Sequence, residues 1–389
     1  MATGRCAAKV ADHAAADEPQ IQPVRRLLVK VGTRVVTDPS AGLDMIFLDR
    51  LARQIARLKD RDIETIIVTS GSVHLGRQVL RHARDKETLT YRQSAAAIGQ
   101  PELMRNYSEA LSAHGLIAAQ VLLTMDDMAH RERYINIRNM LELLLRSRVV
   151  PVINENDSVS VEGVTFVEND KLAAIVATKM KVDLLVFLSD QPGLFTENPL
   201  LHPDAKLIPI VHSGEPLQAE VGTVGGPESR GGMEAKLASA RIAAACGIPA
   251  VMTTAREDNV LLRLCEGERV GTLFLPGHHT VNGKKPWLAT VRHPAGCVAV
   301  DAGACRALSQ SDGASLLASG IVSATGDFQR GDLISVYSGK HEIARGLTNY
   351  SSAEIRKIMG HHSKEIASLL SEAGPDEVIH RDNLVMISE

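Results

Sequence analysis

The chain alternates short apolar runs with longer stretches in which apolar residues recur at helical spacing. Residues 44–59 are such a stretch, with Ile46, Leu48, Leu51, Ile55 and Leu58 at helix-like intervals. Strands that are apolar on both faces and separated by helices form parallel sheets covered on both sides. The sequence therefore predicts the α/β fold class with a mainly parallel central sheet. The apolar runs lie at residues 27–29, 65–68, 117–123, 149–153, 184–188 and 250–253.

The length of 389 residues predicts two or three domains. Residues 1–24 are Ala-rich and polar without periodicity, so we expect a disordered tail there. The α/β pattern fills residues 25–275, and residues 276–294 have the Gly, His, Lys and Pro content of a linker. Residues 295–375 carry short β-type runs and two short helical stretches (302–310 and 351–359), which predict a small, mostly β domain. Residues 376–389 are expected to form a C-terminal tail.

Composition excludes several classes of function. A formal charge of −3 provides no general attraction for nucleic acid or anionic membranes. No apolar run has the length of a membrane span. The five cysteines are odd in number, scattered and never spaced as C-x-x-C. This pattern favours reduced thiols in the cytoplasm over a disulfide framework or a zinc site.

The ends of the predicted strands carry the most polar sequences of the chain, and ligands bind at the carboxyl ends of such sheets. Lys30 follows an apolar run and precedes Gly32, a pattern suited to phosphate binding; a surface lysine capping the strand is the alternative. The next end has the sequence Thr69-Ser70-Gly71-Ser72, whose hydroxyls and amides can bind an anion at a helix start. A helix N-cap without a ligand explains this second stretch equally well.

A third strand end is rich in amides and carboxylates. Asn154-Glu155-Asn156-Asp157 directly follows an apolar run, and Glu168-Asn169-Asp170-Lys171 comes about a dozen residues later. Carboxylates can bind the ammonium group of a zwitterionic substrate, and amides can bind its carboxylates. A polar turn is the alternative. Four consecutive Asn and Glu/Asp residues beside a core strand favour a substrate site.

Two further segments are typical of nucleotide binding. Ser189-Asp190-Gln191-Pro192-Gly193 ends a strand and predicts a sharp turn. Gly225-Gly226 and Gly231-Gly232-Met233 precede a helix that carries Lys236, which predicts a glycine-rich loop around phosphate. The G-x-x-x-x-G-K-[ST] motif is missing from the sequence, so the chain is not a P-loop NTPase.

Taken in order, these motifs resemble those of the glutamate 5-kinases in the amino-acid-kinase superfamily, from residue 25 to the C-terminus. The strings Ile153-Asn-Glu-Asn-Asp157 and Gly231-Gly-Met-Glu-Ala-Lys236 are the most specific. The last domain is similar to a PUA domain, through Ala324-Thr-Gly-Asp-Phe328 and Arg330-Gly-Asp332. The resemblance implies an αβα sandwich (the amino-acid-kinase fold) with a PUA-like domain. It also implies transfer of the ATP γ-phosphoryl group to the γ-carboxylate of L-glutamate, the first step of proline biosynthesis.

The resemblance also implies roles for individual residues. Lys30 and Lys236 would stabilise the transferred phosphate and Asp170 would orient both lysines. Mg²⁺ would be carried on the nucleotide phosphates, with no metal site of the protein's own. Proline is implied as an inhibitor, and a homodimer or homotetramer as the assembly. Glutamate contacts are implied for Ser70, Gly71, Asn154, Asp157, Glu168 and Asn169; ATP contacts are implied for Lys30, Gly32, Ser189, Asp190, Arg230, Gly231, Gly232, Met233, Glu234, Ala235 and Lys236.

Three positions depart from the commoner family pattern. Glu168 stands where an Asp is usual, and its longer side chain puts the placement of the substrate in doubt. Arg230 and Ala235 each replace a Thr, which puts the details of nucleotide contact in doubt. The lysines, glycines and carboxylates are retained, so we predict an active enzyme.

Two other functions remain as alternatives. One is a different carboxylate kinase of the same fold, acting on N-acetylglutamate, aspartate or carbamate. The other is an RNA-binding or regulatory protein that acts through the PUA-like domain. Residues 296–374 hold seven Lys or Arg and eight Asp or Glu, a net charge of −1. RNA affinity depends strongly on neutralising phosphates, so this balance argues against RNA binding as the main role.

Overall fold

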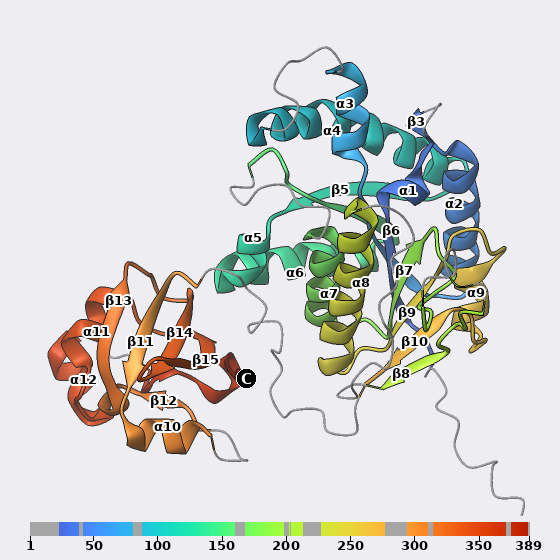
Figure 1. Cartoon of the computed structure of the whole chain (residues 1–389). Helices are drawn as coiled ribbons and strands as arrows, with labels where there is room; N and C mark the ends of the chain where they lie inside the picture. The colour runs from blue at the N-terminus through green and yellow to red at the C-terminus, as the bar shows by residue number, and fades with distance from the viewer. Residues whose placement is uncertain are drawn as a thin grey trace, which may run out of the picture.

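A mainly parallel sheet of eight strands forms the centre of the larger part of the chain (Figure 1). The computed structural model describes residues 23–38, 42–80, 88–159, 168–197, 202, 204–212, 227–276, 294–309, 314–370 and 375–387. The strand order is β5-β6-β4-β1-β7-β9-β10-β8, parallel from β5 to β9, with β10 antiparallel to β9. The strands are β1 (Arg26–Val31), β4 (Glu64–Val68), β5 (Ile117–Leu123), β6 (Val149–Glu155), β7 (Leu184–Ser189), β8 (Ile210–His212), β9 (Ala250–Thr254) and β10 (Thr272–Leu275).

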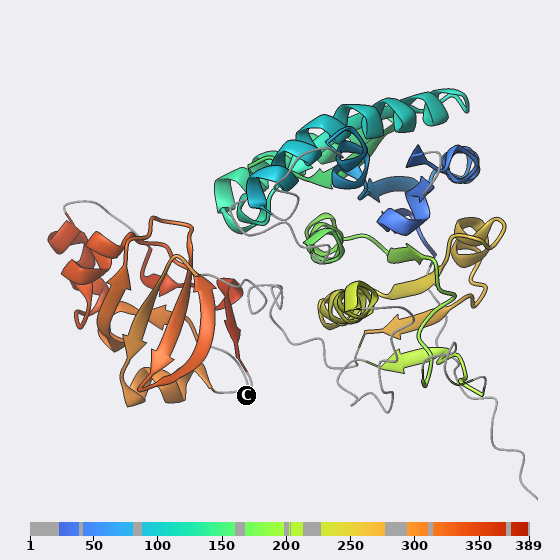
Figure 2. The same cartoon turned by 45° about the horizontal axis from the view of Figure 1, so that its top comes forward.

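Alternate residues of each strand enter two separate apolar layers. In β1, Leu27 and Val29 belong to one layer and Leu28 to the other. Figure 2 shows helices on both sides of the sheet, so the predicted sheet covered on both faces is confirmed. The first layer includes α1 (Thr33–Val36), α2 (Met45–Asp60), α3 (Ser72–Val79), α4 (Leu89–Ser112) and α9 (Val260–Cys265); the second includes α5 (Met125–Ala129), α6 (Arg131–Arg146), α7 (Glu168–Met180) and α8 (Pro227–Ala245).

Helix α2 illustrates how the pattern produces the fold. Asp44 caps its start, since the side chain accepts a hydrogen bond from the Phe47 N–H at 2.8 Å. The buried stripe contains Leu51 and Ile55 as predicted, but Ile46 is 74% exposed and Phe47 is buried instead. The expected helix is thus confirmed. One residue of its apolar face was predicted wrongly: Phe47, not Ile46, faces the sheet.

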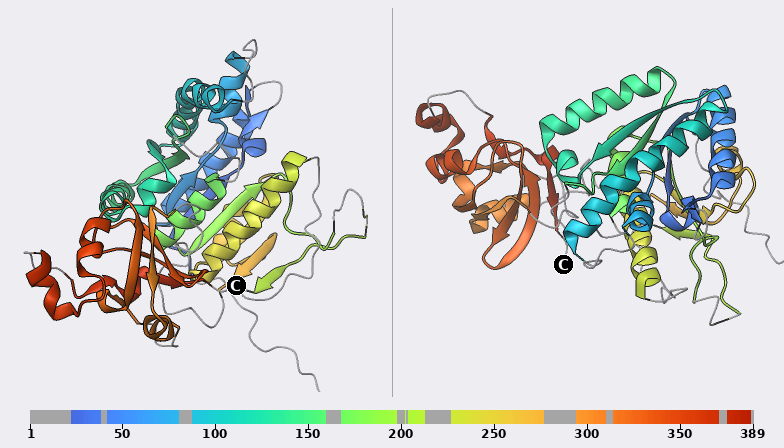
Figure 3. Two further views of the ribbon diagram at one scale, coloured as in Figure 1. Left: turned by 60° about the vertical axis from the view of Figure 1, so that its left-hand side comes forward. Right: turned by 90° about the horizontal axis from the view of Figure 1, so that it is seen from above.

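Helix α7 is buried on almost all sides. Every residue from Leu172 to Ala177 is 0% exposed. The helix packs on the sheet and beside α8, and Figure 3 shows these two helices lying side by side. Such complete burial fixes the first turn of α7, which carries Asn169 and Asp170.

The residues from β11 onward form a smaller unit around a second sheet, ordered β13-β11-β14-β15-β17, and a β12-β16 pair. Its core includes Val298, Phe328, Ile334 and Tyr350. The expected small, mostly β unit is therefore present, and α12 is an element that the sequence did not predict. The elements are β11 (Gly296–Val300), α10 (Ala302–Leu308), β12 (Leu316–Leu317), η2 (Ala318–Gly320), β13 (Ile321–Gly326), β14 (Leu333–Ser338), β15 (His341–Leu347), α11 (Ser352–Ile358), α12 (Ser363–Leu370), β16 (Glu377–Ile379), η3 (Arg381–Asn383) and β17 (Leu384–Met386).

The prediction of a C-terminal tail at residues 376–389 is wrong. β16 pairs with β12, and β17 adds to the edge of the second sheet beside β15. Val378 and Ile379 are 0% exposed, so burial of this short apolar run holds the segment in place. Residues 1–22 of the expected N-terminal tail and residues 277–293 of the expected linker lie outside the described residues.

The smaller unit contacts the larger one beside α5 and α6 (Figure 1). His130, at the junction of these helices, lies 3.1 Å from the Asp332 carboxylate through its Nδ1. Leu333 and Leu347 join the apolar layer that contains α7. Across the described part of the chain, the structure contains no helix with the length and apolar character needed to span a bilayer.

Candidate functional site

The polar strand ends found in the sequence meet at one edge of the sheet. Strands β6, β4, β1, β7 and β9 are neighbours and run in the same direction, so their carboxyl ends point the same way. Lys30 lies at the end of β1, Ser70 follows β4, Asn154 lies in β6 and Ser189 ends β7. We call this region the carboxyl edge.

Two lysines from distant parts of the chain share one carboxylate at this edge. The Lys30 Nζ lies 2.7 Å from Asp170 Oδ1, and the Lys236 Nζ lies 3.6 Å from Asp170 Oδ2. Asp170 is 1% exposed and Lys30 is 2% exposed. The expected convergence of the two ammonium groups is therefore present in the structure.

The charges of this cluster do not cancel. Burial lowers the pKa of Lys30, and the nearby charge of Lys236 lowers it further, against the opposing effect of Asp170. Two ammonium groups around one carboxylate leave one positive charge at the centre of the site. Fixed positive charge in a poorly solvated place is what stabilises the charge of a phosphoryl group during transfer.

Next to the lysines, amide and hydroxyl side chains form a continuous network. Asn169 Nδ2 donates to Ser70 Oγ at 3.2 Å and to Asn154 Oδ1 at 3.0 Å. The Glu155 N–H donates to Asn169 Oδ1 at 3.1 Å, so the end of β6 fixes this amide. Asn154 Nδ2 donates to Ser72 Oγ at 3.2 Å. The structure thus brings together Ser70, Asn154 and Asn169, which the sequence predicted as substrate contacts.

Asp157 lies beside the same network. The Ser72 hydroxyl donates to its Oδ2 at 3.5 Å. The carboxyl is 7% exposed, and burial raises its pKa to about 6. A buried carboxylate of this kind lacks a cationic partner among the described side chains. It is suited to bind a cationic group of a ligand.

Two predicted glycines occupy positions where the backbone turns into a helix. Gly71 is the N-cap of α3 with φ of 118°, and a Cβ there would lie 3.2 Å from Val36 Cγ1. This conformation is strained for any L residue with a side chain. Gly32 is the N-cap of α1, and its N–H donates to the Leu188 carbonyl at 3.3 Å. Both glycines therefore lie at the carboxyl edge beside Lys30 and Ser70.

The side chain of Ser189 closes the predicted turn after β7. Ser189 Oγ donates to the Gln191 carbonyl at 2.8 Å, and the Gln191 N–H donates to Ser189 Oγ at 3.1 Å. Asp190 lies at the surface, 3.6 Å from the Arg34 guanidinium. Both residues thus lie at the carboxyl edge, with Asp190 on its rim.

The expected glycine-rich loop is helical where the structure describes it. Helix α8 begins at Pro227, whose fixed φ suits the first position of a helix, and it includes residues 230–236. Lys236 Nζ donates to the Gly232 carbonyl at 3.2 Å as well as facing Asp170. The predicted helix that carries Lys236 is therefore confirmed, but it begins at Pro227, so Gly231, Gly232 and Met233 lie within it and not in a preceding loop. Ala235 is buried, Met233 packs on the second apolar layer and Glu234 is exposed. The structure does not describe the side chains of Glu168 and Arg230 or the exposure of Gly231.

The sequence analysis missed three polar residues of this region. Gln100, on α4, accepts a hydrogen bond from Asn154 Nδ2 at 2.8 Å. Tyr107, further along the same helix, lies 2.8 Å from Thr69 Oγ1 through its hydroxyl. Ser72 was part of the predicted anion-binding motif, but its contacts with Asn154 and Asp157 were not predicted. No local signal marks Gln100 or Tyr107, because their polar atoms meet the site only through the packing of α4.

The comparisons with known proteins agree with this architecture. The Amino acid kinase family matches residues 25–254, and the PUA domain family matches residues 296–370. The chain belongs to the amino acid kinase family. It is 44% identical over 370 residues to the glutamate 5-kinase of Trichlorobacter lovleyi. That alignment covers 95% of this chain and 98% of the relative. The glutamate 5-kinase of Methylococcus capsulatus is 43% identical over 364 residues, spanning 93% of this chain and 97% of the relative.

Within the family, the resemblance to glutamate 5-kinases with a PUA domain is thereby confirmed, and the chain is an enzyme of the kinase class that uses ATP. Among solved structures, UMP kinase from Bacillus anthracis aligns with a TM-score of 0.47 at 20% identity. That alignment covers 66% of this chain and 97% of the other.

Proposed function

We propose that this enzyme transfers the γ-phosphoryl group of ATP to the γ-carboxylate of L-glutamate and forms L-glutamyl 5-phosphate. The observation that carries the proposal is the Lys30–Asp170–Lys236 cluster directly beside the network of Ser70, Asn154 and Asn169. One region offers positive charge for phosphate, and its neighbour offers hydrogen bonds for a polar, zwitterionic acceptor. The names of the relatives support glutamate as that acceptor.

On the acceptor side, Asp157 would bind the α-ammonium group of glutamate. Ser70 would donate to its carboxylates, and Asn154 and Asn169 would contact them by exchanging present hydrogen bonds of the network for bonds to the ligand. The N–H groups around Gly71 would complete the anion site. Glutamate is ionised at neutral pH, so its γ-carboxylate can attack without a general base. Positioning of the two reactants then supplies much of the rate.

On the phosphate side, Lys30 and Lys236 would contact the oxygens of the transferred group, with Asp170 orienting both ammonium groups. Both Asp170 oxygens already face a lysine at 2.7 and 3.6 Å, so this carboxylate is engaged by the lysines. That arrangement fits Mg²⁺ carried on the nucleotide phosphates, where it would neutralise part of the triphosphate charge. The segment 230–236, Gly32, Ser189 and Asp190 would contact ATP.

The proposal is tested by ADP release measured with glutamate, N-acetylglutamate, aspartate and carbamate as acceptors. Glutamate should give the highest kcat/KM, and preference for another acceptor would replace glutamate in the proposal. Lys236→Ala should lower kcat about a hundredfold, because loss of one preorganised donor costs ~3 kcal/mol. Lys206→Ala changes an exposed lysine and is the matched control. A kcat within threefold of the unaltered enzyme in Lys236→Ala would refute the assigned role.

The same proposal extends to the cellular setting of the enzyme. Its product would enter proline biosynthesis, and proline would restrain the enzyme. A rise in the apparent KM for glutamate when proline is added would support this regulation. The scattered cysteines favour a cytoplasmic location, and sedimentation would determine whether the enzyme is a dimer or a tetramer.

A further inference from the structure

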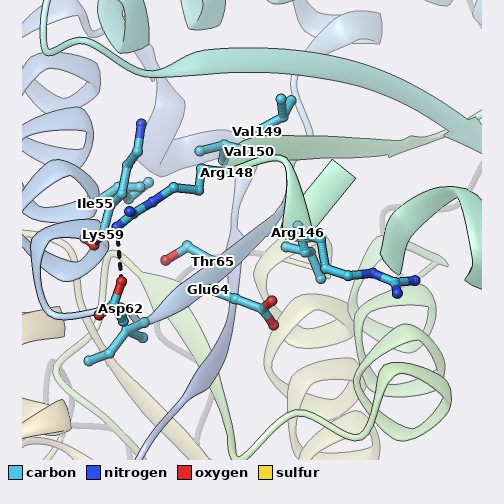
Figure 4. Close-up of a pocket in the computed structure, with 11 residues that line it drawn as sticks. Ile55, Lys59, Asp62, Glu64, Thr65, Arg146, Arg148, Val149 and Val150 are labelled. Atoms are coloured by element: carbon cyan, nitrogen blue, oxygen red, sulfur yellow. Dashed lines mark hydrogen bonds and ion pairs between the residues drawn. The ribbon is translucent and has the colours of Figure 1, made fainter. Parts of the chain in front are cut away.

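A cavity lies at the opposite edge of the same sheet, which we call the amino edge. It has a volume of about 290 Å³ and lies among α2, the start of β4, the end of α6 and the start of β6 (Figure 4). This volume is near the lower end of the ~300–1,000 Å³ usual for small-molecule sites. A ligand that fills it is therefore a small molecule, and it would bind far along the strands from Lys30 and Asp170.

The cavity exists because two neighbouring strands separate. β4 and β6 are paired only at Ile67–Val152 and Val68–Ile153. The Ile153 carbonyl accepts from the Thr69 N–H at 2.8 Å, so the polar groups of Ile153 face β4, and by two-residue alternation those of Pro151 do too. Pro151 has no N–H to donate, so the ladder stops there. Toward the amino ends, the facing edges of the two strands are open.

The buried surface of this cavity holds a polar atom without a partner. Thr65 is 5% exposed, and its Oγ1 has no hydrogen-bond partner in the structure. Figure 4 shows that this oxygen points toward Lys59 and Asp62 across the cavity. Leaving a buried hydroxyl unsatisfied costs roughly 1–3 kcal/mol, so the position is suited to a ligand that makes this hydrogen bond.

The mouth of the cavity holds a guanidinium group that is already oriented. Arg148 Nη2 donates to Asp62 Oδ1 and to the Lys59 carbonyl, both at 2.9 Å. These bonds occupy both hydrogens of Nη2, and the N–H groups of Nη1 and Nε remain to donate a single charge-assisted hydrogen bond to a carboxylate oxygen. The Lys59 carbonyl is the part of Lys59 that meets Arg148 here, whereas the Lys59 ammonium donates to the Gly115 carbonyl at 3.4 Å.

Between the mouth and Thr65 the walls are apolar. They are formed by Ile55, Ile63, Val149 and Val150. We propose that this cavity is a second binding site, for a small aliphatic carboxylate that carries a second polar group. The carboxylate binds Arg148 at the mouth, the aliphatic part lies between the walls, and the polar group bonds to Thr65. The proposal does not rest on the activity proposed above.

The test uses the full chain without added L-glutamate, because glutamate is itself a carboxylate with further polar groups; the variants below assign the binding to the amino edge. Binding is measured by ligand-observed NMR for ω-hydroxy carboxylates of three to six carbons. Each is compared with the plain carboxylate and with the diol of the same length. At least one ω-hydroxy carboxylate should bind more tightly than both comparison compounds. Absence of binding by the whole series, or equal binding of the diols, would overturn the proposal.

Two variants locate the binding. Arg148→Gln should weaken it about tenfold, the usual effect of removing a charge-assisted hydrogen bond. The control Arg53→Gln removes an exposed, ion-paired arginine that lies on α2 and does not line the cavity, and it should leave binding unchanged. Thr65→Val should abolish the preference for the hydroxylated ligand without lowering the melting temperature, since it removes an unsatisfied hydroxyl. Unchanged binding in Arg148→Gln, or tighter binding of inorganic phosphate than of every carboxylate, contradicts the proposed site.

Discussion

The two edges of the central sheet treat charge in opposite ways. At the carboxyl edge, Lys30 and Asp170 are buried in contact with each other. At the amino edge, Arg148 Nη2 lies 2.9 Å from Asp62 Oδ1, but these side chains are 57% and 88% exposed. Burial makes a charge strongly dependent on its partner, whereas water screens an exposed charge. The N···O distance alone therefore does not determine how much each pair contributes to stability. The pair with the larger desolvation cost, the buried one, lies where the reaction is proposed.

The pairing of β4 with β6 also differs between the two edges. Toward the carboxyl ends the two strands are joined, and the network of Ser70, Asn154 and Asn169 spans them. Toward the amino ends Pro151 stops the ladder and a cavity opens. At the carboxyl edge the two strands are therefore joined by hydrogen bonds, whereas at the amino edge they are unpaired and the Thr65 hydroxyl has no hydrogen-bond partner.

The largest effect is expected for Asp170→Asn. The substitution keeps the shape of the side chain but leaves Lys30 and Lys236 without their shared carboxylate. We expect kcat to fall at least about a hundredfold and the free energy of unfolding to fall by ~3–5 kcal/mol, as for other broken buried pairs. Steady-state kinetics and urea unfolding measure the two effects. Asp258→Asn changes an aspartate that is 85% exposed and should alter neither by much; similar losses in both variants would contradict the comparison.

A smaller effect, with a defined pH dependence, is expected at Asp157. Its pKa is about 6 in the folded chain, against the ordinary aspartate value of 3.8 that the unfolded chain should show. The folded state therefore binds the proton more tightly, and stability decreases as the pH rises from about 4 to 6, by roughly 2–3 kcal/mol in total. Asp157→Asn should remove this decrease. Urea unfolding of both proteins at a series of pH values measures it.

The same ionisation should govern binding of the substrate. Because the ionised carboxylate would bind the ammonium group of glutamate, the KM for glutamate should fall as the pH rises through about 6. In Asp157→Asn the KM should be high at every pH, with the KM for ATP little changed. If only the KM for ATP responds, Asp157 does not contact glutamate.

How far the sequence predicted these features depends on whether their cause is local. Six strands of the large sheet and Lys30, Ser70 and Asn154 were predictable, because apolar runs and the polar residues that follow them are neighbours in the sequence; β8 and β10 were not predicted. The contact of Gln100 with Asn154 spans 54 residues and depends on how α4 packs, so no pattern indicates it. The start of α8 was predicted too late because paired glycines are typical of loops, whereas Pro227 also suits the first position of a helix.

The cavity at the amino edge was equally unpredictable. Pro151 lies within an apolar run that predicts a strand, and β6 is indeed a strand. Only the pairing register reveals that its backbone faces β4, where the missing N–H matters. The β17 strand was missed for a similar reason, since its partner β15 is far away in the sequence.

An intermediate effect is expected for Arg26, at the amino edge but half-buried. Its Nε lies 2.7 Å from Glu64 Oε2 and its Nη1 lies 2.8 Å from Glu142 Oε1. Arg26→Met should lower the free energy of unfolding by about 2 kcal/mol, between the values for buried and exposed pairs. Arg26 lowers the pKa of Glu142, so this part of the stability is present at neutral pH and lost as the pH falls through that lowered pKa. The difference between variant and unaltered protein should therefore shrink in acid; a constant difference would mean that packing alone is lost.

The smallest effect is expected for the exposed pair of Arg148 and Asp62. A double-mutant cycle with Arg148→Gln and Asp62→Asn should give a coupling free energy below about 1 kcal/mol, because both groups are hydrated before and after folding. The coupling should fall further between about 0.05 and about 0.5 M salt, since exposed charges are screened over roughly a Debye length. A coupling as large as that lost in Asp170→Asn, or one insensitive to salt, would mean that the two edges do not differ in how they hold charge. In that case burial would not be what distinguishes the cluster of Lys30, Asp170 and Lys236.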